Sequence, residues 1–483
     1  MADRARYVPI GMVETSPKKE SLNHLAGWLV AVLLPPAVYA AGLASNFTVE
    51  AAIFTAILSA VVALWVFSLV PEFVPPLIAV VATLFVGLAP PEIALAGFAS
   101  PSLLLLLGVF ALSAVISGSG LSYRVMLWLL LKLPDRSFWH RFTLLVGGYF
   151  LSPIMPSANS RLSLLQPLFR DMADGLHLPL RGSAITGLLA ATFGGALLMS
   201  PMMATSKSSN IAAINFLPPQ VQEEFLGTFW LVAAGVAAAT MTLVHFLAVY
   251  RMFPEPGGNH LPREHLQRQQ DELGPLKNME RVAAVMFVFF LGGSMTVSWH
   301  HVPAAWIAGF VLVGLLLSGV LTRGEFQKQI DWPMIFFLLG VDSLMKVMHH
   351  LGLVEDLARA TAGIYGFIGG NISRFILAAL VTTLLLRLAL PVTAGMLTSA
   401  VILLPVSAAE GIHPWVCIFL TAVFSDIWFA GYQGTNGFLQ LRSAGLMDLV
   451  NEPAFKRYNM VMNIARVAAV FASIPWWRWL GLL

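Results

Sequence analysis

The chain has 483 residues, of which 58% are hydrophobic and only 11% are charged, and its formal net charge is +3. Soluble globular chains carry about 25% charged residues, so this composition excludes a water-soluble protein. The small excess of Lys and Arg predicts no nucleic-acid partner, and the single cysteine, Cys417, excludes an intrachain disulfide and a Cys-rich metal site.

The first 25 residues are polar, and the apolar part of the chain begins after them. Residues 1–25 contain Arg4, Arg6, Lys18 and Lys19, so the positive-inside rule predicts that this segment stays cytoplasmic. Stretches that reach or approach the length needed to cross a bilayer as a helix follow. They are residues 26–43, 51–70, 102–118, 226–250, 282–298, 303–321 and 375–390. The sequence therefore predicts an all-α polytopic protein of the cell inner (plasma) membrane, with the lipid bilayer as a partner.

A polar stretch, residues 253–281, divides the chain almost in half. We expect it to be a linker between a first transmembrane repeat, residues 26–252, and a second, residues 282–483. Residues 106–121 align without gaps with residues 338–353, and both segments begin with LLGV and end with Gly-Leu. Repeated halves with interrupted helices indicate a secondary transporter, and an odd number of crossings in each half would make the repeats inverted.

Four interruptions of the apolar pattern are rich in small hydroxyl and amide residues. They are PIMPSANSR (153–161) and ATSKSSN (204–210) in the first half, and LPVTAGMLTS (390–399) and AGYQGTN (430–436) in the second. Unwound backbone is tolerated at membrane depth only beside protein or a water-filled cavity, and the first amides of a half-helix bind anions. A single small-residue cluster is more often a packing face. Four clusters at corresponding positions favour a binding site.

Ionisable residues near these interruptions are costly at membrane depth and are candidate functional groups. Lys207 lies inside the second interruption, and Asp426 lies just before its counterpart in the other half. We therefore predict a charge pair between them, with Arg161 as a third candidate member. The alternative is that Arg161 and Asp426 reach the headgroup region, and Arg387 is open to the same two interpretations.

Residues 70–121 resemble the opening repeat segment of the divalent anion/sodium symporter family, which includes dicarboxylate, citrate and sulfate carriers. The resemblance rests on an early Pro pair, the segment ALAGFASP, and LLGVFAL, with a counterpart at residues 331–353. It implies two inverted repeats, each with a re-entrant helical hairpin and a broken helix, in an elevator-type transporter that is usually a homodimer. It also implies that the hairpin tips, normally Ser-Asn-Thr, bind substrate carboxylates and help to form sodium sites.

This chain departs from the family pattern at the tips and at the first broken helix. The tips become residues 157–159, Ser-Ala-Asn, and 395–397, Gly-Met-Leu, and the usual Thr-Pro-Pro-Asn becomes Lys-Ser-Ser-Asn at 207–210. The expected substrate-binding residues are Ser157, Asn159, Ser160, Lys207, Ser208, Asn210, Thr393, Gly395, Thr398, Ser399, Tyr432, Gln433, Thr435 and Asn436. No cofactor is expected other than sodium as a coupling ion, whose site would use Ser157, Asn159, Asn210 and Asn436. The Lys207 ammonium suits the binding of an anion without sodium.

These features predict a secondary active transporter of a small anion, such as a dicarboxylate, sulfate or a related organic anion. It would be coupled to sodium or protons, or act as an exchanger. The alternative is an integral-membrane enzyme acting on a lipid-linked substrate, which needs a catalytic constellation that no apolar segment provides. The histidine pairs 300–301 and 349–350 lack a carboxylate or Cys at ligand spacing and are expected at helix ends. A passive channel would have a continuous pore, whereas paired interruptions fit alternating access.

Overall fold

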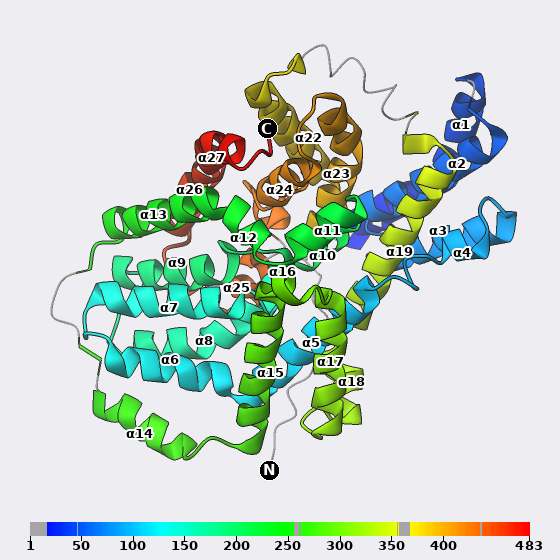
Figure 1. Cartoon of the computed structure of the whole chain (residues 1–483). Coiled ribbons are helices and arrows are strands. Elements are labelled where there is room, and N and C mark those ends of the chain that lie inside the picture. The colour runs from blue at the N-terminus through cyan, green and yellow to red at the C-terminus, as the bar shows by residue number, and fades with distance from the viewer. Residues whose placement is uncertain are drawn as a thin grey trace.

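The computed structural model describes residues 17–45, 47–255, 260–261, 263–354, 356, 368–434 and 437–483, and all regular elements in them are helices (Figure 1). The predicted all-α fold is therefore confirmed. Of the predicted N-terminal segment, residues 1–16 lie outside the described residues, and α1 (Pro17–Ala44) begins inside the remainder.

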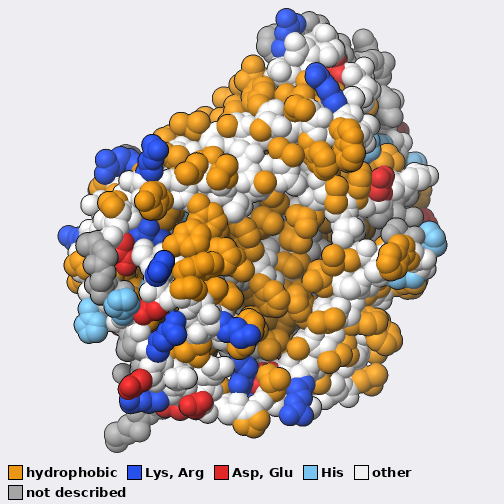
Figure 2. All heavy atoms as spheres, turned by 60° about the vertical axis from the view of Figure 1, so that its left-hand side comes forward, with side chains coloured by type: hydrophobic (Ala, Val, Ile, Leu, Met, Phe, Trp, Pro, Cys, Tyr) orange, Lys and Arg blue, Asp and Glu red, His pale blue; other side chains and the backbone are white. Residues whose placement is uncertain are grey.

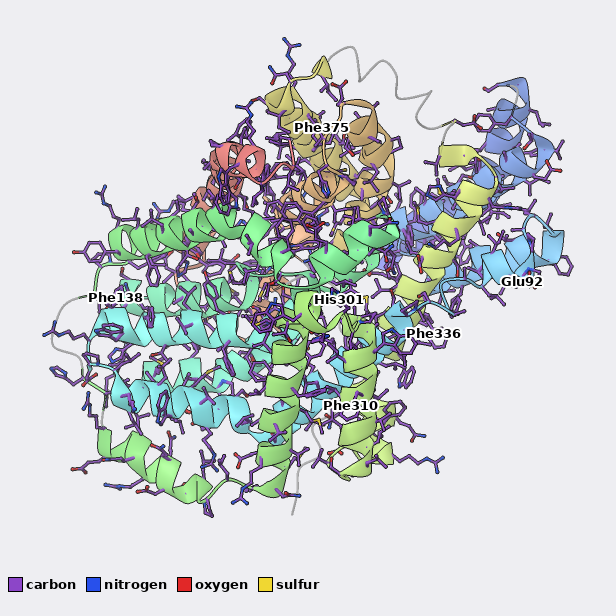
Figure 3. All side chains as sticks on the ribbon, viewed as in Figure 1. Glu92, Phe138, His301, Phe310, Phe336 and Phe375 are labelled. Atoms are coloured by element: carbon purple, nitrogen blue, oxygen red, sulfur yellow. The ribbon has the colours of Figure 1, made fainter. Side chains whose placement is uncertain are left out.

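Seven helices in the described part of the chain are long and apolar enough to cross a membrane. They are His24–Ala44, Val49–Val66, Ser102–Ser119, Gly235–Met252, Ile372–Ala389, Val392–Ala409 and Glu452–Trp479. Hydrophobic side chains cover the middle of the face in Figure 2, and charged side chains gather toward its margins. Phe310 is 61% exposed and Phe336 is 41% exposed, and both lie on the outside of the molecule (Figure 3). A surface of this kind needs a lipid environment, so the chain is a multi-pass membrane protein.

The predicted span 226–250 is wrong as a single helix. It comprises the end of α11 (Pro219–Leu226), all of α12 (Phe229–Ala233) and most of α13 (Gly235–Met252). Gly227 has extended backbone, with φ −87° and ψ −148°, and therefore separates α11 from α12. The apolar composition of the stretch did not reveal this break, because apolarity reports burial or lipid contact rather than helix continuity.

One group of helices, the flanking bundle, forms one side of the molecule (Figure 1). It contains α1, α2 (Val49–Val66), α3 (Val74–Val86), α4 (Pro91–Ala94), α5 (Ser102–Ser119), α15 (Asn278–Met295), α16 (Val297–His300), α17 (Ala304–Leu317), α18 (Arg323–Gln329) and α19 (Trp332–His350). Within it α2 and α19 pack on α3, and α15 and α17 pack on α5. The two predicted helix-end histidine pairs lie at the ends of α16 and α19.

The remaining transmembrane helices form the hairpin bundle, which holds three of the four sequence interruptions and the described part of the fourth, residues 430–434. Its elements are α7 (Ser137–Leu151), α8 (Ala158–Gly175), α9 (Ser183–Leu197), η1 (Ala204–Ser206), α10 (Ser208–Ile214), α13, α22 (Ile372–Ala389), α23 (Val392–Ala409), α24 (Pro414–Ser425), η2 (Gly431–Gln433), α25 (Phe438–Ser443), α26 (Glu452–Ala472) and α27 (Ile474–Trp479). Helix α9 is buried from its second residue to its last and lies at the centre of this bundle. Glycines bring α7 onto it, since a Cβ on Gly148 would stand 2.2 Å from the backbone of Gly195.

Two helices join the bundles at the polar linker. Helix α6 (Leu121–Lys132) follows α5, and α14 (Arg263–Leu273) lies within the predicted linker and packs on α6. Arg124 on α6 donates from Nε to Glu280 Oε1 at 2.9 Å, which fixes the start of α15. The linker therefore holds a helix of its own that is bound to the first half.

The same order of elements occurs in both halves. In the first half, a hairpin turn at residues 152–157 joins α7 to α8, and the broken helix α9–η1–α10 follows. In the second half, a turn at residues 390–391 joins α22 to α23, and the broken helix α24–η2–α25 follows. The predicted interruption 390–399 is therefore too long, because helix begins again at Val392. That the repeats are inverted and the hairpins re-entrant stays a prediction.

Candidate functional site

A polar cavity of roughly 150 Å³ lies where the first hairpin turn, both broken helices and the flanking bundle meet. It is lined by Phe110, Pro156, Ser157, Ala158, Asn159, Leu197, Ser200, Lys207, Ser208, Asp331, Met334, Thr393 and Asp426. Six residues that the sequence singled out therefore face one space, and they come from both halves of the chain.

Lys207 and Asp426 join the two halves at this cavity. The Lys207 Nζ atom lies 2.7 Å from Asp426 Oδ1 and donates to Ser425 Oγ at 3.0 Å. The two charged side chains are only 8% and 6% exposed. Asp426 Oδ2 is buried and accepts no hydrogen bond. The pair is thus a buried ion pair in which the carboxylate retains an unused acceptor.

Arg161 is fully buried behind the cavity, and its guanidinium is held by oxygen atoms that carry no formal charge. Its Nε donates to the carbonyl of Ala196 at 2.7 Å, and its Nη2 donates to Ser200 Oγ at 2.5 Å. Its Nη1 donates to the carbonyls of Met155 and Ser206. The interpretation that Arg161 and Asp426 reach the headgroup region is therefore wrong, because tertiary packing encloses both side chains.

Arg387 occupies a similar position in the second half, and its side chain is also buried. Its Nε donates to the carbonyl of Ser425 at 3.0 Å, its Nη1 to that of Leu390 at 3.1 Å, and its Nη2 to that of Gln433 at 2.6 Å. The sequence did not include Arg387 among the site residues. The sequence feature that could have identified Arg387 is its position as the one charged residue in the apolar run LLLRLALP.

The first hairpin turn is fixed by its own polar side chains. Ser157 caps α8 by accepting from the Ser160 N–H at 3.3 Å. Asn159 Oδ1 accepts from the backbone N–H of Gly437 at 2.9 Å, across the gap between the two halves. The Ser208 N–H donates to the Pro156 carbonyl at 3.0 Å. These contacts place the N-terminal end of α8 at the cavity.

Several predicted residues do not line this cavity. They are Ser160, Asn210, Gly395, Thr398, Ser399 and Gln433. Ser399 Oγ donates to the Gly395 carbonyl within α23 at 2.7 Å, and Gln433 Oε1 accepts from the N–H groups of Phe429 and Ala430. Thr435, Asn436 and the side chain of Tyr432 lie outside the described residues. The use of all these residues in binding stays a prediction.

The Asn210 side chain forms hydrogen bonds with the backbone of the first broken helix. Its Nδ2 donates to the carbonyls of Ser200 and Met203 at 2.8 and 3.0 Å. Its Oδ1 is buried and accepts no hydrogen bond, and the neighbouring Ser209 Oγ is also without a partner. Of the four residues predicted to form a sodium site, Ser157 and Asn159 line the cavity, whereas Asn210 lies behind it.

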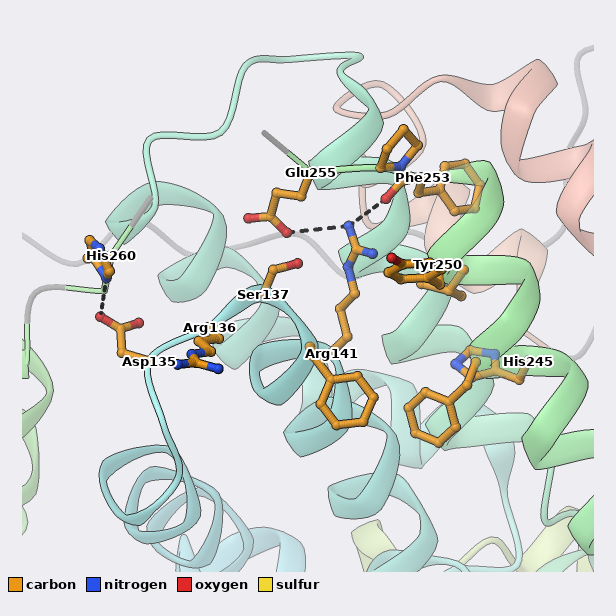
Figure 4. Close-up of a pocket in the computed structure, with 13 residues that line it drawn as sticks. Asp135, Arg136, Ser137, Arg141, His245, Tyr250, Phe253, Glu255 and His260 are labelled. Atoms are coloured by element: carbon orange, nitrogen blue, oxygen red, sulfur yellow. Dashed lines mark hydrogen bonds and ion pairs between the residues drawn. The ribbon is translucent and has the colours of Figure 1, made fainter. Parts of the chain in front are cut away.

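A larger cavity, of roughly 550 Å³, lies at the start of α7, the end of α13 and the linker (Figure 4). In it, Arg141 Nη2 lies 3.4 Å from Glu255 Oε2, and Asp135 Oδ2 lies 3.1 Å from His260 Nδ1. Burial tends to raise the pKa of Asp135, but hydrogen bonds from the Leu261 N–H and His140 outweigh it and lower that pKa. Both carboxylates are thus engaged by basic side chains. The ion pairs around this cavity hold the linker against the start of the first hairpin. The interruptions meet at the smaller polar cavity instead.

A family model described as the sodium:sulfate symporter transmembrane region matches residues 22–483. Over 298 residues the chain is 25% identical to the putative malate transporter YflS of Bacillus subtilis, covering 58% of this chain and 60% of that protein. It is 20% identical to the L-tartrate/succinate antiporter of Escherichia coli, over 56% of this chain and 57% of that protein. The matched stretches thus span less than two thirds of the length of these two relatives. The solved YdaH transporter of Alcanivorax borkumensis is 14% identical with a TM-score of 0.49, covering 78% of this chain and 85% of that one.

Proposed function

We propose that this chain, which belongs to the sodium:sulfate symporter transmembrane region family, is a secondary active transporter of a small dianion of the dicarboxylate type. The relatives named for malate transport and for tartrate and succinate antiport support a dicarboxylate. The residues that surround the polar cavity support a dianion independently, through their charge. The bacterial relatives favour the inner membrane.

The observation that carries this proposal is an excess of positive charge beside the polar cavity. Asp426 acts electrostatically on three buried cations, Lys207, Arg161 and Arg466, and Arg387 acts on Lys207 as a fourth cation. Arg466 is 3% exposed and donates to Asn463 Oδ1 at 3.1 Å. Two carboxylates, Asp426 and Asp331, line the cavity, so two of these four cations have no carboxylate in its lining. Uncompensated charge is costly in a buried site, so a bound dianion would stabilise this arrangement.

The cavity also offers hydrogen-bond donors of the type that carboxylates bind. The N-terminal ends of α8 and α23 reach it through Ser157 and Thr393, and each helix is 18 residues long. Helix N-termini carry partial positive charge and unpaired N–H groups. We assign one substrate carboxylate to Lys207 and the α8 end, and the other to the α23 end. Ser208 and Asn159 would supply further side-chain contacts.

Counterflow in liposomes tests the function. Purified protein in vesicles loaded with unlabelled succinate should accumulate labelled succinate, and malate or tartrate inside should support the same uptake. An enzyme would release a product, and a channel would equilibrate the label whether or not anion is present inside. Absence of both counterflow and ligand-induced thermal stabilisation for every dianion tried, sulfate included, would contradict the proposal.

Variants of the cavity locate the site. Ser157→Ala and Thr393→Ala should each weaken succinate binding by about tenfold, since each removes a hydrogen bond to a charged group. Ser443→Ala is the matched control, because the Ser443 hydroxyl donates to its own helix at an exposed position. Equal changes of succinate affinity in all three variants would contradict the assignment of the cavity as the binding site.

We further propose that the hairpin bundle moves against the flanking bundle as an elevator, within a homodimer. The polar cavity supports this because it lies on the boundary, lined by Ala158 from one bundle and Met334 from the other. A disulfide between Ala158→Cys and Met334→Cys, in a Cys417→Ser background, should arrest counterflow until it is reduced. Unchanged counterflow in the fully cross-linked protein would contradict the elevator. Mass measurement in detergent tests the dimer.

A further inference from the structure

The cavity at the start of α7, roughly 550 Å³ in volume, has no role in the proposed function. Its lining combines charged and apolar side chains. In Figure 4, Asp135 and Arg136 lie on one side, Tyr250 and Phe253 lie on the other, and Arg141 stands between them. A space of this size with both kinds of lining suits an amphiphile, which is a molecule with a charged group and an apolar body.

The cavity lies where a membrane span ends. Helix α13 is one of the seven candidate spans, and the polar linker follows its last residue. Leu243, Leu247 and Tyr250 on this helix are each more than half exposed, and so is Phe138 on α7, whose ring centroid lies 5.5 Å from that of Phe246. Exposed apolar side chains and a tyrosine at the end of a span are typical of contact with lipid. Because Phe138 and Tyr250 also line the cavity, its wall continues onto the surface that faces lipid.

Two arginines line the cavity, and each has donors that no described residue uses. Arg136 is exposed, and its side chain makes no hydrogen bond or ion pair with a described residue. Arg141 is 9% exposed and donates from Nη2 to the carbonyl of Phe253 at 2.8 Å, whereas its Nε is buried without a hydrogen-bond partner. Unpaired buried donors are costly, and guanidinium groups suit the oxygens of a phosphate. The two arginines therefore favour a phosphate group.

Of the two carboxylates in the lining, Glu255 retains an oxygen atom that accepts from no described residue. Both oxygens of Asp135 are engaged, Oδ1 by His140 at 2.8 Å and Oδ2 by His260 at 3.1 Å. Glu255 Oε2 lies 3.4 Å from Arg141 Nη2, and only this oxygen of Glu255 contacts a described donor. A charge-assisted hydrogen bond is normally about 2.7–2.9 Å long, so the Glu255 carboxylate can accept from a further donor.

The formal charges of the lining balance. Two arginines face two carboxylates, and the two histidines of the lining, His245 and His260, already contact Tyr458 and Asp135. A purely anionic ligand would set its charge against both carboxylates, and a purely cationic ligand would set its charge against both arginines. A zwitterion that carries a phosphate and an ammonium matches both signs at once.

We propose that this cavity binds the headgroup of a phospholipid that carries both a phosphate and a primary ammonium, as phosphatidylethanolamine does. The phosphate lies between Arg136 and Arg141, the ammonium donates to Glu255, and the acyl chains follow Phe138 and the exposed face of α13. The lipid thereby joins the beginning of the linker to the first hairpin. This inference is independent of the proposed function, because it uses no residue of the polar cavity.

Melting temperatures of the full chain, purified in detergent and stripped of lipid, test the proposal. Phosphatidylethanolamine should raise the melting temperature at about tenfold lower concentration than phosphatidylcholine or phosphatidylglycerol with the same acyl chains. The trimethylammonium of phosphatidylcholine has no N–H to donate to Glu255, and the headgroup of phosphatidylglycerol has no cation. Phosphoethanolamine has the charges without the acyl chains and should need a concentration about a hundredfold higher than the lipid. Equal potency of the three lipids would overturn the proposal, and phosphoethanolamine as potent as the lipid would contradict a ligand from the membrane.

Variants locate the headgroup. Arg136→Ala should weaken the response to phosphatidylethanolamine about tenfold, because it removes a charged donor that the described contacts do not use. Glu255→Gln should remove most of the preference for phosphatidylethanolamine over phosphatidylcholine and leave the response to phosphatidylcholine unchanged. Arg251→Ala is the matched control, since Arg251 is exposed in the last turn of α13 but is not part of the lining.

Two results for these variants would contradict the assignment. One is an Arg136→Ala protein that responds to phosphatidylethanolamine as strongly as Arg251→Ala does. The other is a Glu255→Gln protein that keeps the full preference between the two lipids. Each comparison is made between lipids within one variant or between lipid responses, so a general loss of stability does not imitate the expected outcome.

Discussion

The buried ion pair between Lys207 and Asp426 can be tested with a double-mutant cycle. The variants are Lys207→Met, Asp426→Asn and the two together. Because both side chains are less than a tenth exposed, either single change leaves a buried charge without its partner. Removing one partner of a buried pair costs about 3–5 kcal/mol of unfolding free energy.

The structure predicts which single change costs more. Asp426 is shared by Lys207, Arg161 and Arg466, so Asp426→Asn leaves three cations uncompensated and should fall near the upper limit, about 5 kcal/mol. After Lys207→Met the carboxylate still faces two cations, so the loss should be nearer about 3 kcal/mol. The double variant removes both charges, and its loss should be smaller than the sum of the single losses by about 2–3 kcal/mol.

Two measurements are needed for this cycle. Unfolding free energies come from denaturant titration in detergent. The pair Lys456–Glu452 on α26, whose side chains are 47% and 27% exposed, is the control, and its coupling should be at most about 0.5 kcal/mol. Succinate affinity should fall in both variants that lack Lys207 and should rise in Asp426→Asn, which frees the ammonium. A coupling at Lys207 and Asp426 no larger than that of the control pair would refute the reasoning. So would unchanged succinate affinity in Lys207→Met.

Two further changes test the packing and the linker. Gly148→Ala should greatly reduce the yield of folded protein, because the new Cβ would stand 2.2 Å from the Gly195 backbone. Overpacking of a core typically costs about 1–3 kcal/mol or more. Gly292→Ala is the control, since no atom lies within 4 Å of its new Cβ. Equal yields of the two variants, measured by size-exclusion chromatography, would contradict the described contact of α7 and α9. Asp135→Asn should lower the melting temperature at neutral pH, because the pKa of Asp135 is lowered in the folded protein. The ionised carboxylate therefore stabilises the fold above the unfolded pKa of about 3.9, and this stabilisation is lost as pH falls through the folded pKa. A difference between Asp135→Asn and the unmodified protein that stayed constant from pH 7 down to pH 3 would contradict this interpretation.

The order of elements could be predicted from local patterns. The family resemblance is confirmed by the match over residues 22–483, and the hairpin turn before α8, residues 152–157, overlaps the predicted interruption 153–161. Pro and Ser act on the backbone over one or two residues, so their effect is visible in the sequence. Helix boundaries were less accurate where nothing local marks them. In the interruption 390–399 the hydroxyl of Ser399 is satisfied within its own helix, and the helix continues through it.

The choice of site residues was only partly predictable for a geometric reason. Thr393 and Thr398 both belong to the first turns of α23, but only Thr393 lines the polar cavity. Residues on one helix point in several directions, and which direction faces the cavity depends on how α23 packs on its neighbours. The correspondence between the halves identified the segment without giving its orientation.

By itself, the sequence determined that this protein lives in a membrane, that its two halves share an order of elements, and where polar residues interrupt its helices. These properties depend on composition and on interactions between residues close along the chain. The charge pair of Lys207 and Asp426 was predicted from the sequence, and the two side chains lie 2.7 Å apart. Only the tertiary structure decided the partners of the two buried arginines. Arg161 and Arg387 bind carbonyls of matching segments from positions that do not align in sequence. The partner of a buried cation is set by tertiary packing, because a buried charge without a partner is costly and only folding brings an oxygen atom to it.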